Sequence, residues 1–243
     1  MLNEMLINGV DVQNYNARLL TYSVSGTTLT NNTFSNSSLL KMPSLFKTTL
    51  GTRQLNITLT FKPSQIGSDS KGMSVTDRLA TATDNISRFE AEIIGKTVEL
   101  TLPDGYIYTA LVTSITAASF DASGEHDVSY TFNAIRHKPQ EIVSIKPNTI
   151  FYCKSTTATP CKFIVVPHRD FDSVAIMGIK VNNLTENSEY IIDGINSIIT
   201  LDGVNKFIDT DCVDFPCLMP GENIISSETE DVEITIVYTP IYV

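Results

Sequence analysis

Two short apolar runs near the C-terminus each close on Asp-Gly, which is a hairpin-type turn signal: Ile191-Ile192-Asp193-Gly194 and Ile198-Ile199-Thr200-Leu201-Asp202-Gly203. The segment after them cannot be helical, because Phe215-Pro216 and Pro220-Gly221 interrupt it. Apolar and polar side chains then alternate in Val232–Tyr238. This region predicts the closing strands of a β-sandwich rather than a catalytic loop.

The composition supports the same fold class for the whole chain. It has 243 residues, of which 42% are hydrophobic and 18% charged, as expected for one large or two ordinary folded domains. Val, Ile, Thr and Tyr are abundant, Trp is absent, and glycines and prolines are scattered singly between short apolar runs. A mainly β protein is therefore expected.

The charge is distributed unevenly. Residues 1–140 contain 11 Lys and Arg against 12 Asp and Glu, whereas residues 141–243 contain 6 against 15. We therefore expect two domains, 1–140 and 141–243, that meet at Lys138-Pro139-Gln140. The acidic second half argues against binding to nucleic-acid phosphates and to anionic membranes.

The first half alternates strands with polar segments. Residues 5–12 predict a strand broken by a type I′ turn at Asn8-Gly9, and residues 17–24 predict a second strand. Thr27–Ser38 is rich in Ser, Thr and Asn and is expected to be a loop. Arg53–Lys62 then alternates strictly, which predicts an amphipathic strand.

A single helix is predicted between residues 75 and 94. Ser74 is a suitable N-cap with Asp77 in a near capping box, and Gly95 ends the helix. Its expected apolar face consists of Val75, Leu79, Ala82, Ile86, Phe89 and Ile93. A hairpin around Pro103-Asp104-Gly105 and a strand over His126–His137 follow, so the first domain is expected to be α+β with a mainly antiparallel sheet.

The second half predicts strands only. They are expected at Phe163–Val166, Ser173–Val181, Glu189–Asp193, Ile198–Leu201 and Glu233–Tyr238.

No motif in the chain indicates an enzyme. A G-x-S-x-G elbow and a glycine-rich phosphate loop are both missing from the sequence, and His126, His137 and His168 lie in or beside polar turns. Asp209, Asp211 and Asp214 could bind calcium, but an acidic solvated loop is the favoured interpretation, since the glycine and glutamate of an EF-hand are lacking. We expect no cofactor and no catalytic residue.

The four cysteines all lie in the second half: Cys153, Cys161, Cys212 and Cys217. A four-thiolate zinc site is one interpretation, although neither pair has C-x-x-C spacing. Reduced, partly buried thiols are the alternative. A secretory signal and an apolar run of about 20 residues are also missing, so synthesis in the cytosol without a membrane anchor is expected.

The order of these features resembles the distal tail proteins, baseplate hub components of siphophages and prophages of Gram-positive bacteria. The resemblance is carried by Ile7-Asn8-Gly9-Val10-Asp11, by the helix and the Leu102–Gly105 hairpin, and by a C-terminal phrase. That phrase contains Phe215, Pro216, Pro220, Gly221 and Asn223 and resembles the family pattern F-P-x-L-x-P-G-x-N-x-I. Its Pro and Gly are expected to set a bend, and Asn223 to bond to nearby backbone.

The resemblance implies a tail-tube-like α+β sandwich domain followed by a galectin-like or carbohydrate-binding-module-like β-sandwich. It implies a homohexameric ring in the virion tail tip, made in the cytoplasm of the host bacterium, through which DNA passes. The implied partners are the major tail-tube protein, the tape-measure protein and a tail-associated tip or receptor-binding protein. Sequence-specific nucleic-acid binding and membrane binding are not implied.

Three loops are candidates for contacts between subunits: Lys62–Gly72 with Gln65 and Lys71, Asn31–Ser38, and the hairpin with Asp104 and Gly105. Ordinary surface loops are the alternative interpretation for each. A second function, sugar binding by the tail tip, would depend on His168, Arg169 and scattered tyrosines, because the Trp on which lectins often stack a sugar is absent. A tail hydrolase is a third possibility that no motif supports.

Overall fold

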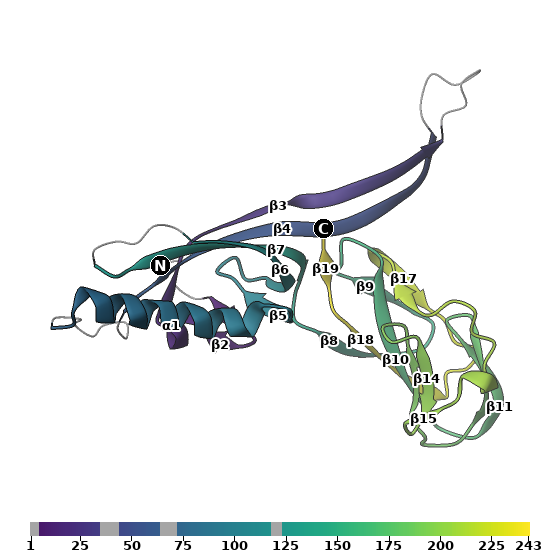
Figure 1. The fold of residues 1–243 in the computed structure, drawn as a ribbon. Coiled ribbons are helices and arrows are strands. Elements are labelled where there is room, and N and C mark those ends of the chain that lie inside the picture. The colour runs from purple at the N-terminus through teal and green to yellow at the C-terminus, as the bar shows by residue number, and fades with distance from the viewer. Residues whose placement is uncertain (1–4, 35–43, 64–71, 118–122) are drawn as a thin grey trace. The chain divides into compact units, whose positions relative to one another are not determined.

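The computed structural model describes residues 5–34, 44–63, 72–117 and 123–243 of the chain, which divides into two compact units (Figure 1). Unit 1 consists of Met1–Arg136 and Val243, and unit 2 consists of His137–Tyr242. Both units are built mainly from strands, and α1 (Val75–Ile93) is the one α-helix of the described residues. This confirms the predicted class, a mainly β chain with one central helix.

Unit 1 is built around one sheet with the strand order β2-β1-β5-β6-β7-β4-β3. The recorded pairings β1–β2, β1–β5, β5–β6, β3–β4 and β4–β7 are antiparallel. The elements are β1 (Leu6–Ile7), β2 (Val10–Asp11), the 3-10 helix η1 (Val12–Tyr15), β3 (Ala17–Phe34), β4 (Ser44–Phe61), α1, β5 (Thr97–Thr101), β6 (Ile107–Ala117) and β7 (His126–His137).

One predicted loop of unit 1 is wrong. Thr27–Ser38 was expected to be irregular, but Thr27–Phe34 forms the outer part of β3 and pairs with β4 as far as Phe34↔Ser44. The partner strand supplies the backbone hydrogen bonds that Ser, Thr and Asn side chains would otherwise satisfy locally. Residues 35–43 lie outside the described structure.

The predicted helix caps are confirmed. Ser74 has extended backbone angles, and its Oγ accepts a hydrogen bond of 3.1 Å from the backbone N of Asp77. Gly95, just beyond the helix, has φ +71°. Val75, however, is 64% exposed, while Asn85 is buried and donates from Nδ2 to Lys62 O. The buried face of the helix therefore differs from the predicted one, because it lacks Val75 and includes Asn85.

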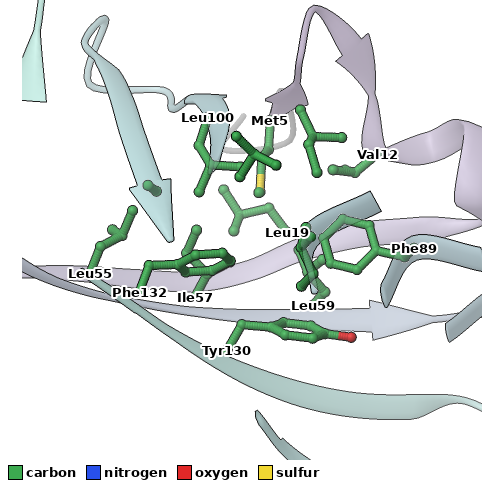
Figure 2. Packing of buried hydrophobic residues seen from close by; sticks show 14 of the residues in the cluster. Met5, Val12, Leu19, Leu55, Ile57, Leu59, Phe89, Leu100, Tyr130 and Phe132 are labelled. Carbon is green, nitrogen blue, oxygen red and sulfur yellow. The ribbon is translucent and has the colours of Figure 1, made fainter. Parts of the chain in front are cut away.

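Helix α1 packs on one face of the sheet through Phe89 (Figures 1 and 2). The fully buried Phe89 ring lies 5.6 Å from the Tyr15 ring, 5.7 Å from Phe61 and 5.2 Å from Tyr130, measured between centroids. Leucine, isoleucine and phenylalanine side chains of β3, β4 and β7 complete this core: Leu19, Leu55, Ile57, Leu59 and Phe132. The opposite side chains of β4 and β7 point away from the helix.

Unit 2 contains a sheet in the order β15-β14-β13-β10-β18-β8, with β16 paired to β10, and the two-stranded ribbons β11–β12 and β17–β9. The elements are β8 (Glu141–Ile145), β9 (Thr149–Cys153), β10 (Thr159–Pro167), β11 (Phe171–Ile176), β12 (Ile179–Leu184), β13 (Tyr190–Asp193), β14 (Ile198–Leu201), β15 (Val204–Asn205), η2 (Phe207–Asp209), β16 (Cys217–Leu218), β17 (Gly221–Ile225), β18 (Val232–Tyr238) and β19 (Ile241–Tyr242).

Two details of the predicted strands change in unit 2. The expected strand Ser173–Val181 is a hairpin, because Met177 and Gly178 both adopt positive φ (52° and 77°) and turn the chain between β11 and β12. The connection from β13 to β14 has four residues, 194–197, with the positive φ at Ser197 rather than at Gly194. The hairpin turn predicted at Asp202-Gly203 is present, with φ 46° and 81°.

The core of unit 2 lies beneath β10 and β18, whose inward side chains are fully buried: Phe163, Val165, Ile234, Ile236 and Tyr238. The Phe151 ring of β9 meets the Tyr238 ring edge-on at 5.5 Å. Unit 2 thus has its own hydrophobic core, separate from the core of unit 1. No helix in the described part of the chain is both long enough and apolar enough to cross a membrane.

Candidate functional site: the β3–β4 hairpin and its base

The β3–β4 hairpin is far longer than the sheet that supports it. Each strand has 18 residues, or about 60 Å at ~3.3 Å per residue. Strand β7 pairs with β4 only from Arg53 to Phe61. The outer pairs, from Leu29↔Leu50 to Phe34↔Ser44, join β3 and β4 alone, and Figure 1 shows them as a two-stranded ribbon beyond the end of β7.

Polar contacts join the two strands where the ribbon leaves the sheet. Arg53 donates from Nη1 to Ser25 O at 3.0 Å, and the backbone N of Gln54 donates to Ser25 Oγ at 2.8 Å. Thr28 donates from Oγ1 to Thr52 O at 3.1 Å. These bonds lie where the register shifts between Val24 and Leu29. Since an isolated two-stranded ribbon is marginally stable in water, the outer part is suited to packing on another surface.

The predicted interface residues Asp104 and Gly105 form the β5–β6 turn. Asp104 Oδ1 accepts from the backbone N of Tyr106 at 3.0 Å, and Oδ2 accepts from the Tyr108 hydroxyl at 2.5 Å. Gly105 has φ +75°. Burial, together with the hydrogen bond to Asp104, raises the pKa of Tyr108. Both oxygens of the Asp104 carboxylate thus accept hydrogen bonds from the same β5–β6 hairpin.

Two arginines at this end of unit 1 gave no signal in the sequence. Arg53 pairs with Ala134, and Arg136 lies two residues further along β7 on the same face. The Nε atoms of both are buried and make no hydrogen bond, while the Arg136 guanidinium lies 4.6 Å from the centre of the Tyr106 ring. Burial, and then the charge of Arg136, lower the pKa of Arg53. The base of the hairpin therefore carries positive charge.

The other predicted interface segments are only partly described. Gln65 and Lys71 lie outside the described residues, as does most of the Lys62–Gly72 segment. Of Asn31–Ser38, the backbone of residues 31–34 belongs to β3 and the rest is not described. Asp104 and Gly105 are therefore the two named interface candidates whose side chains and backbone the structure describes.

The N-terminal signature residues form a tight turn in unit 1. Asn8 and Gly9 have φ 49° and 79°, as a type I′ turn requires. The Asn8 side chain accepts a hydrogen bond of 2.9 Å from the backbone N of Glu99, and its own backbone N donates to Glu99 O. This turn thereby fastens β1 to β5.

The C-terminal signature residues shape the loop before β17 in unit 2. Asn223 makes the expected backbone bonds: its Oδ1 accepts from Met219 N at 2.8 Å, and its Nδ2 donates to Met219 O and Gly221 O. These bonds span Pro220, and Gly221 has φ +85°. The Phe215 ring stacks on the Phe207 ring, with 6.0 Å between their centroids. The carbonyl oxygen of Pro216 accepts a hydrogen bond of 3.3 Å from the backbone N of Cys161. These contacts join residues of unit 2 to one another.

The structure does not assemble the alternative metal sites. In the part of the chain that is described, no three His, Cys, Asp or Glu side chains are placed to hold one ion. Asp209 pairs with Lys206 at 3.1 Å, and Asp211 Oδ1 accepts from the backbone N of Lys180. All four cysteines are free thiols, and burial raises the pKa of Cys161 to about 12, so this thiol is protonated and unreactive at neutral pH.

The two predicted sugar-facing residues, His168 and Arg169, do not line the same hollow in unit 2. His168 lines an open hollow of about 660 Å³, together with polar and charged side chains of the β8–β9 turn and of β18 and the residues before it: Lys146, Asn148, Glu230 and Glu233. Arg169 does not line it. Its Nε pairs with Asp231 at 2.9 Å, and its guanidinium lies over the Phe171 ring.

The fold of the whole chain is similar to that of a solved phage protein. The crystal structure of the SPP1 Dit (gp 19.1) protein, described as a paradigm of the hub adsorption apparatus in phages that infect Gram-positive bacteria, matches with a TM-score of 0.75. The match covers 100% of both chains at 13% sequence identity. The chain therefore has the hub-protein fold over its whole length, as the sequence resemblance implied.

A second solved structure, the phage P2 baseplate in its activated conformation with Ca, matches with a TM-score of 0.48 at 12% identity and covers 99% of this chain and 98% of that one. No protein-family model and no curated protein sequence matches the chain.

Proposed function

We propose that the chain is a structural protein of a phage tail tip, a baseplate hub rather than an enzyme. Six copies form a ring that joins the tail tube to the tip or receptor-binding apparatus and lets DNA pass. The observation that carries this proposal is the β3–β4 hairpin, whose outer strands, among the described residues, pair only with each other beyond Arg53. The whole-length likeness to the SPP1 hub protein supports it.

The hairpin suits a contact between copies of the chain. A cyclic ring needs heterologous contacts, in which one patch meets a different patch on the neighbour. A long ribbon with free backbone edges reaches past its own sheet and presents such a patch. The near-neutral charge of residues 1–140 also lets copies of unit 1 approach one another without strong repulsion.

The same assembly defines the partners and the location. The ring contacts the major tail-tube protein and the tape-measure protein on one side and a tail-associated tip or receptor-binding protein on the other. It is made in the cytoplasm of the host bacterium and resides in the virion tail tip. The acidic residues 141–243 keep the second unit solvated.

The test shortens the hairpin and measures assembly. Replacing residues 29–50 by Asn-Gly removes the ribbon but keeps the inner part of β3, which pairs with β4, and the inner part of β4, which pairs with β7. We expect the unmodified chain to show hexamer mass by native mass spectrometry and light scattering, and the shortened chain to be a folded monomer by circular dichroism. The matched control, Met177→Asn, places the same Asn-Gly pair in the β11–β12 turn of unit 2. This variant should still form hexamers.

Two results would contradict the proposal. Hexamer mass for the shortened chain would show that the hairpin does not hold the ring together. A monomer for the unmodified chain at every concentration, and in the presence of tube protein, would exclude the ring itself.

A second function, sugar binding by unit 2, is favoured by the hollow that His168 lines with Lys146, Asn148 and Glu233. Amide, imidazole, ammonium and carboxylate groups are suitable partners for sugar hydroxyls. A glycan array would test it: a specific hit that is lost in His168→Ala and kept in Arg169→Ala would establish the site, whereas silence would favour the hub role alone.

A further inference from the structure

Two arginine side chains meet where the inward face of the unit 1 sheet ends. In the core of that face, Leu55 of β4 lies opposite Phe132 of β7, and the next inward pair is Arg53 and Ala134. Arg136 lies two residues beyond Ala134, so its side chain leaves β7 on the same face as Arg53 and diagonal to it. A face that buries aliphatic and aromatic side chains thus ends at two cations. We call Arg53 and Arg136 the arginine pair.

The arginine pair has few partners within the described chain. Arg53 donates from Nη1 to Ser25 O at 3.0 Å, and the Arg136 guanidinium lies 4.6 Å from the centre of the Tyr106 ring. Both side chains are half-buried, and their Nε atoms are shielded from solvent without a hydrogen bond. Among the residues that the structure describes, no Asp or Glu forms an ion pair with either guanidinium. Several N–H donors of each planar guanidinium are therefore available to another group.

The carboxylate of Asp104 does not neutralise the arginine pair. It belongs to the β5–β6 turn, next to Tyr106, whose ring contacts Arg136. Its two oxygens accept hydrogen bonds from the backbone N of Tyr106 and from the Tyr108 hydroxyl, and it forms no ion pair with either arginine. The charge of the pair is thus not compensated by this neighbouring carboxylate.

Two like charges that are partly removed from water destabilise each other. Burial, and then the charge of Arg136, lower the pKa of Arg53. A guanidinium nevertheless stays protonated at physiological pH, so the pair cannot relieve the repulsion by losing a proton. An anion can relieve it, and the planar fork of arginine matches a carboxylate with two parallel N–H···O bonds. The pair therefore suits a carboxylate supplied from outside the isolated chain.

A second copy of the chain can supply this carboxylate. Acidic residues outnumber basic ones by 27 to 17 in the whole chain and by 15 to 6 in residues 141–243. The pair also lies beside Ser25, where the hairpin of the proposed ring contact leaves the sheet. Two copies cannot meet pair to pair, because four guanidinium groups would repel one another. The pair must instead meet a different, acidic patch, as the heterologous contact of a ring requires.

We propose that the arginine pair of each subunit binds an Asp or Glu side chain of the neighbouring copy and thereby fixes the contact between them. This inference rests on the proposed function and deepens it, because it adds a charged contact at the base of the hairpin to the contact made by the outer ribbon. Loss of one arginine should weaken the ring but should not destabilise the single chain, in which the two charges only repel each other.

The first test compares assembly with stability. Arg136→Gln removes one charge of the pair, and the matched control Arg88→Gln removes the same charge from an exposed position on α1. Native mass spectrometry and light scattering over a range of protein concentrations measure assembly. We expect Arg136→Gln to raise the concentration at half assembly by about tenfold, and Arg88→Gln to leave it unchanged within about twofold. Thermal unfolding of dilute, monomeric protein should show Arg136→Gln to be at least as stable as the unmodified chain.

Each other outcome overturns the inference. Normal assembly of Arg136→Gln would show that the pair makes no contact between copies. A lower unfolding temperature of monomeric Arg136→Gln would show that the arginine stabilises its own chain instead. Failure of the unmodified chain to form a ring at any concentration would contradict the proposed function itself, and the inference would fall with it.

The second test identifies the carboxylate. Rings of Arg136→Lys, which keeps the charge, are assembled from a mixture of ¹⁵N-labelled and unlabelled chains and treated with a water-soluble carbodiimide, which joins an amine to a carboxylate that it contacts. We expect residue 136 of one chain to become linked to a single Asp or Glu of another chain, as peptide masses with mixed labelling would show. Arg88→Lys is the control and should not link to that carboxylate.

Three results of these measurements would contradict the proposed partner. A link from residue 136 to Asp104 of the same chain would make the contact internal. The absence of any link in intact rings would show that no carboxylate reaches the pair. Retention of duplex DNA by the unmodified chain in an electrophoretic shift assay, lost in Arg136→Gln and kept in Arg88→Gln, would assign the pair to phosphate instead.

Discussion

Among single residues, Gly194 is needed for the space it leaves. A Cβ built on it would collide with Pro216 O and would lie 2.8 Å from Cys161 O, both of which are backbone atoms that cannot swing aside. Its own backbone N donates to Cys161 O at 2.9 Å. The loop that carries Phe215 and Pro216 therefore sits against β10 and the β13–β14 connection only because residue 194 lacks a side chain.

We expect Gly194→Ala to lower the free energy of unfolding of unit 2 by about 3 kcal/mol, the upper range for overpacking against a rigid neighbour. Urea denaturation monitored by circular dichroism measures this change. Gly26→Ala is the control, because a Cβ there has no neighbour within 4 Å and φ is not positive. Equal stability of the two variants would show that the loop moves away freely.

The environment of Asp193 determines the pKa of its side chain. Its side chain is 2% exposed and pairs with Lys162 at 3.0 Å. Burial alone would raise its pKa, but hydrogen bonds from Asn196, Lys162 and the backbone N of Ile195 outweigh burial and lower it. A lowered pKa means that the folded state binds this proton less readily than the unfolded state. The carboxylate thus contributes stability above its ordinary pKa of 3.8, and this contribution is lost as pH falls through the folded-state pKa.

Asp193→Asn should therefore cost about 2 kcal/mol at pH 7 and progressively less below pH ~4. Urea denaturation of both proteins across this pH range provides the measurement. Asp172→Asn, at an exposed carboxylate on β11, should leave stability nearly unchanged at every pH. A cost for Asp193→Asn that does not vary with pH would contradict the assigned ionisation.

Among the elements, α1 depends on one aromatic anchor. Phe89 is fully buried and meets three other rings, and its side chain lies among the core residues of the sheet (Figure 2). Helix propensity alone would not hold this segment against the sheet, because most helical stability in proteins comes from packing of an apolar face.

We expect Phe89→Ala to destabilise unit 1 by about 3–5 kcal/mol, as buried aromatic truncations do. Val75→Ala, at an exposed position in the first turn of the same helix, should change stability by less than about 0.5 kcal/mol. Thermal and chemical unfolding of the two variants would separate the anchor from helix propensity. Similar losses in both would argue that α1 is held by its backbone alone.

In the whole molecule, the two units have separate hydrophobic cores. We therefore propose that residues 1–140 and 141–243 are independently folding domains, whose observed boundary lies between Arg136 and His137. Calorimetry should show two unfolding transitions. Phe89→Ala should lower only one of them, and Asp193→Asn only the other.

Expression of residues 137–243 alone offers the matching control, since it should unfold cooperatively at the temperature of the second transition. A single transition that both substitutions shift together would contradict independent folding.

Local chemistry allowed several elements to be predicted from the sequence, because the residues that decide them are neighbours in the chain. Positive φ at Asn8-Gly9 and at Asp202-Gly203 needs only those residues, the Ser74 cap bonds three positions ahead, and alternation alone locates His126–His137. Features that depend on distant partners escaped prediction. The outer part of β3 is a strand because β4 pairs with it, although its Ser, Thr and Asn composition is typical of a loop.

The same physical reason applies to the functional surfaces. Asp104 stays a predicted interface residue, and the hydrogen bond from the Tyr108 hydroxyl to its carboxylate was not expected from the sequence. The Arg53–Arg136 pair exists only because β4 and β7 adopt one particular register between segments that are far apart in the sequence. A shift of one residue would bring Leu55 and Ile57 to the surface. Turns and caps thus follow from local sequence, whereas the surfaces that would act in an assembly arise from strand pairing across the fold.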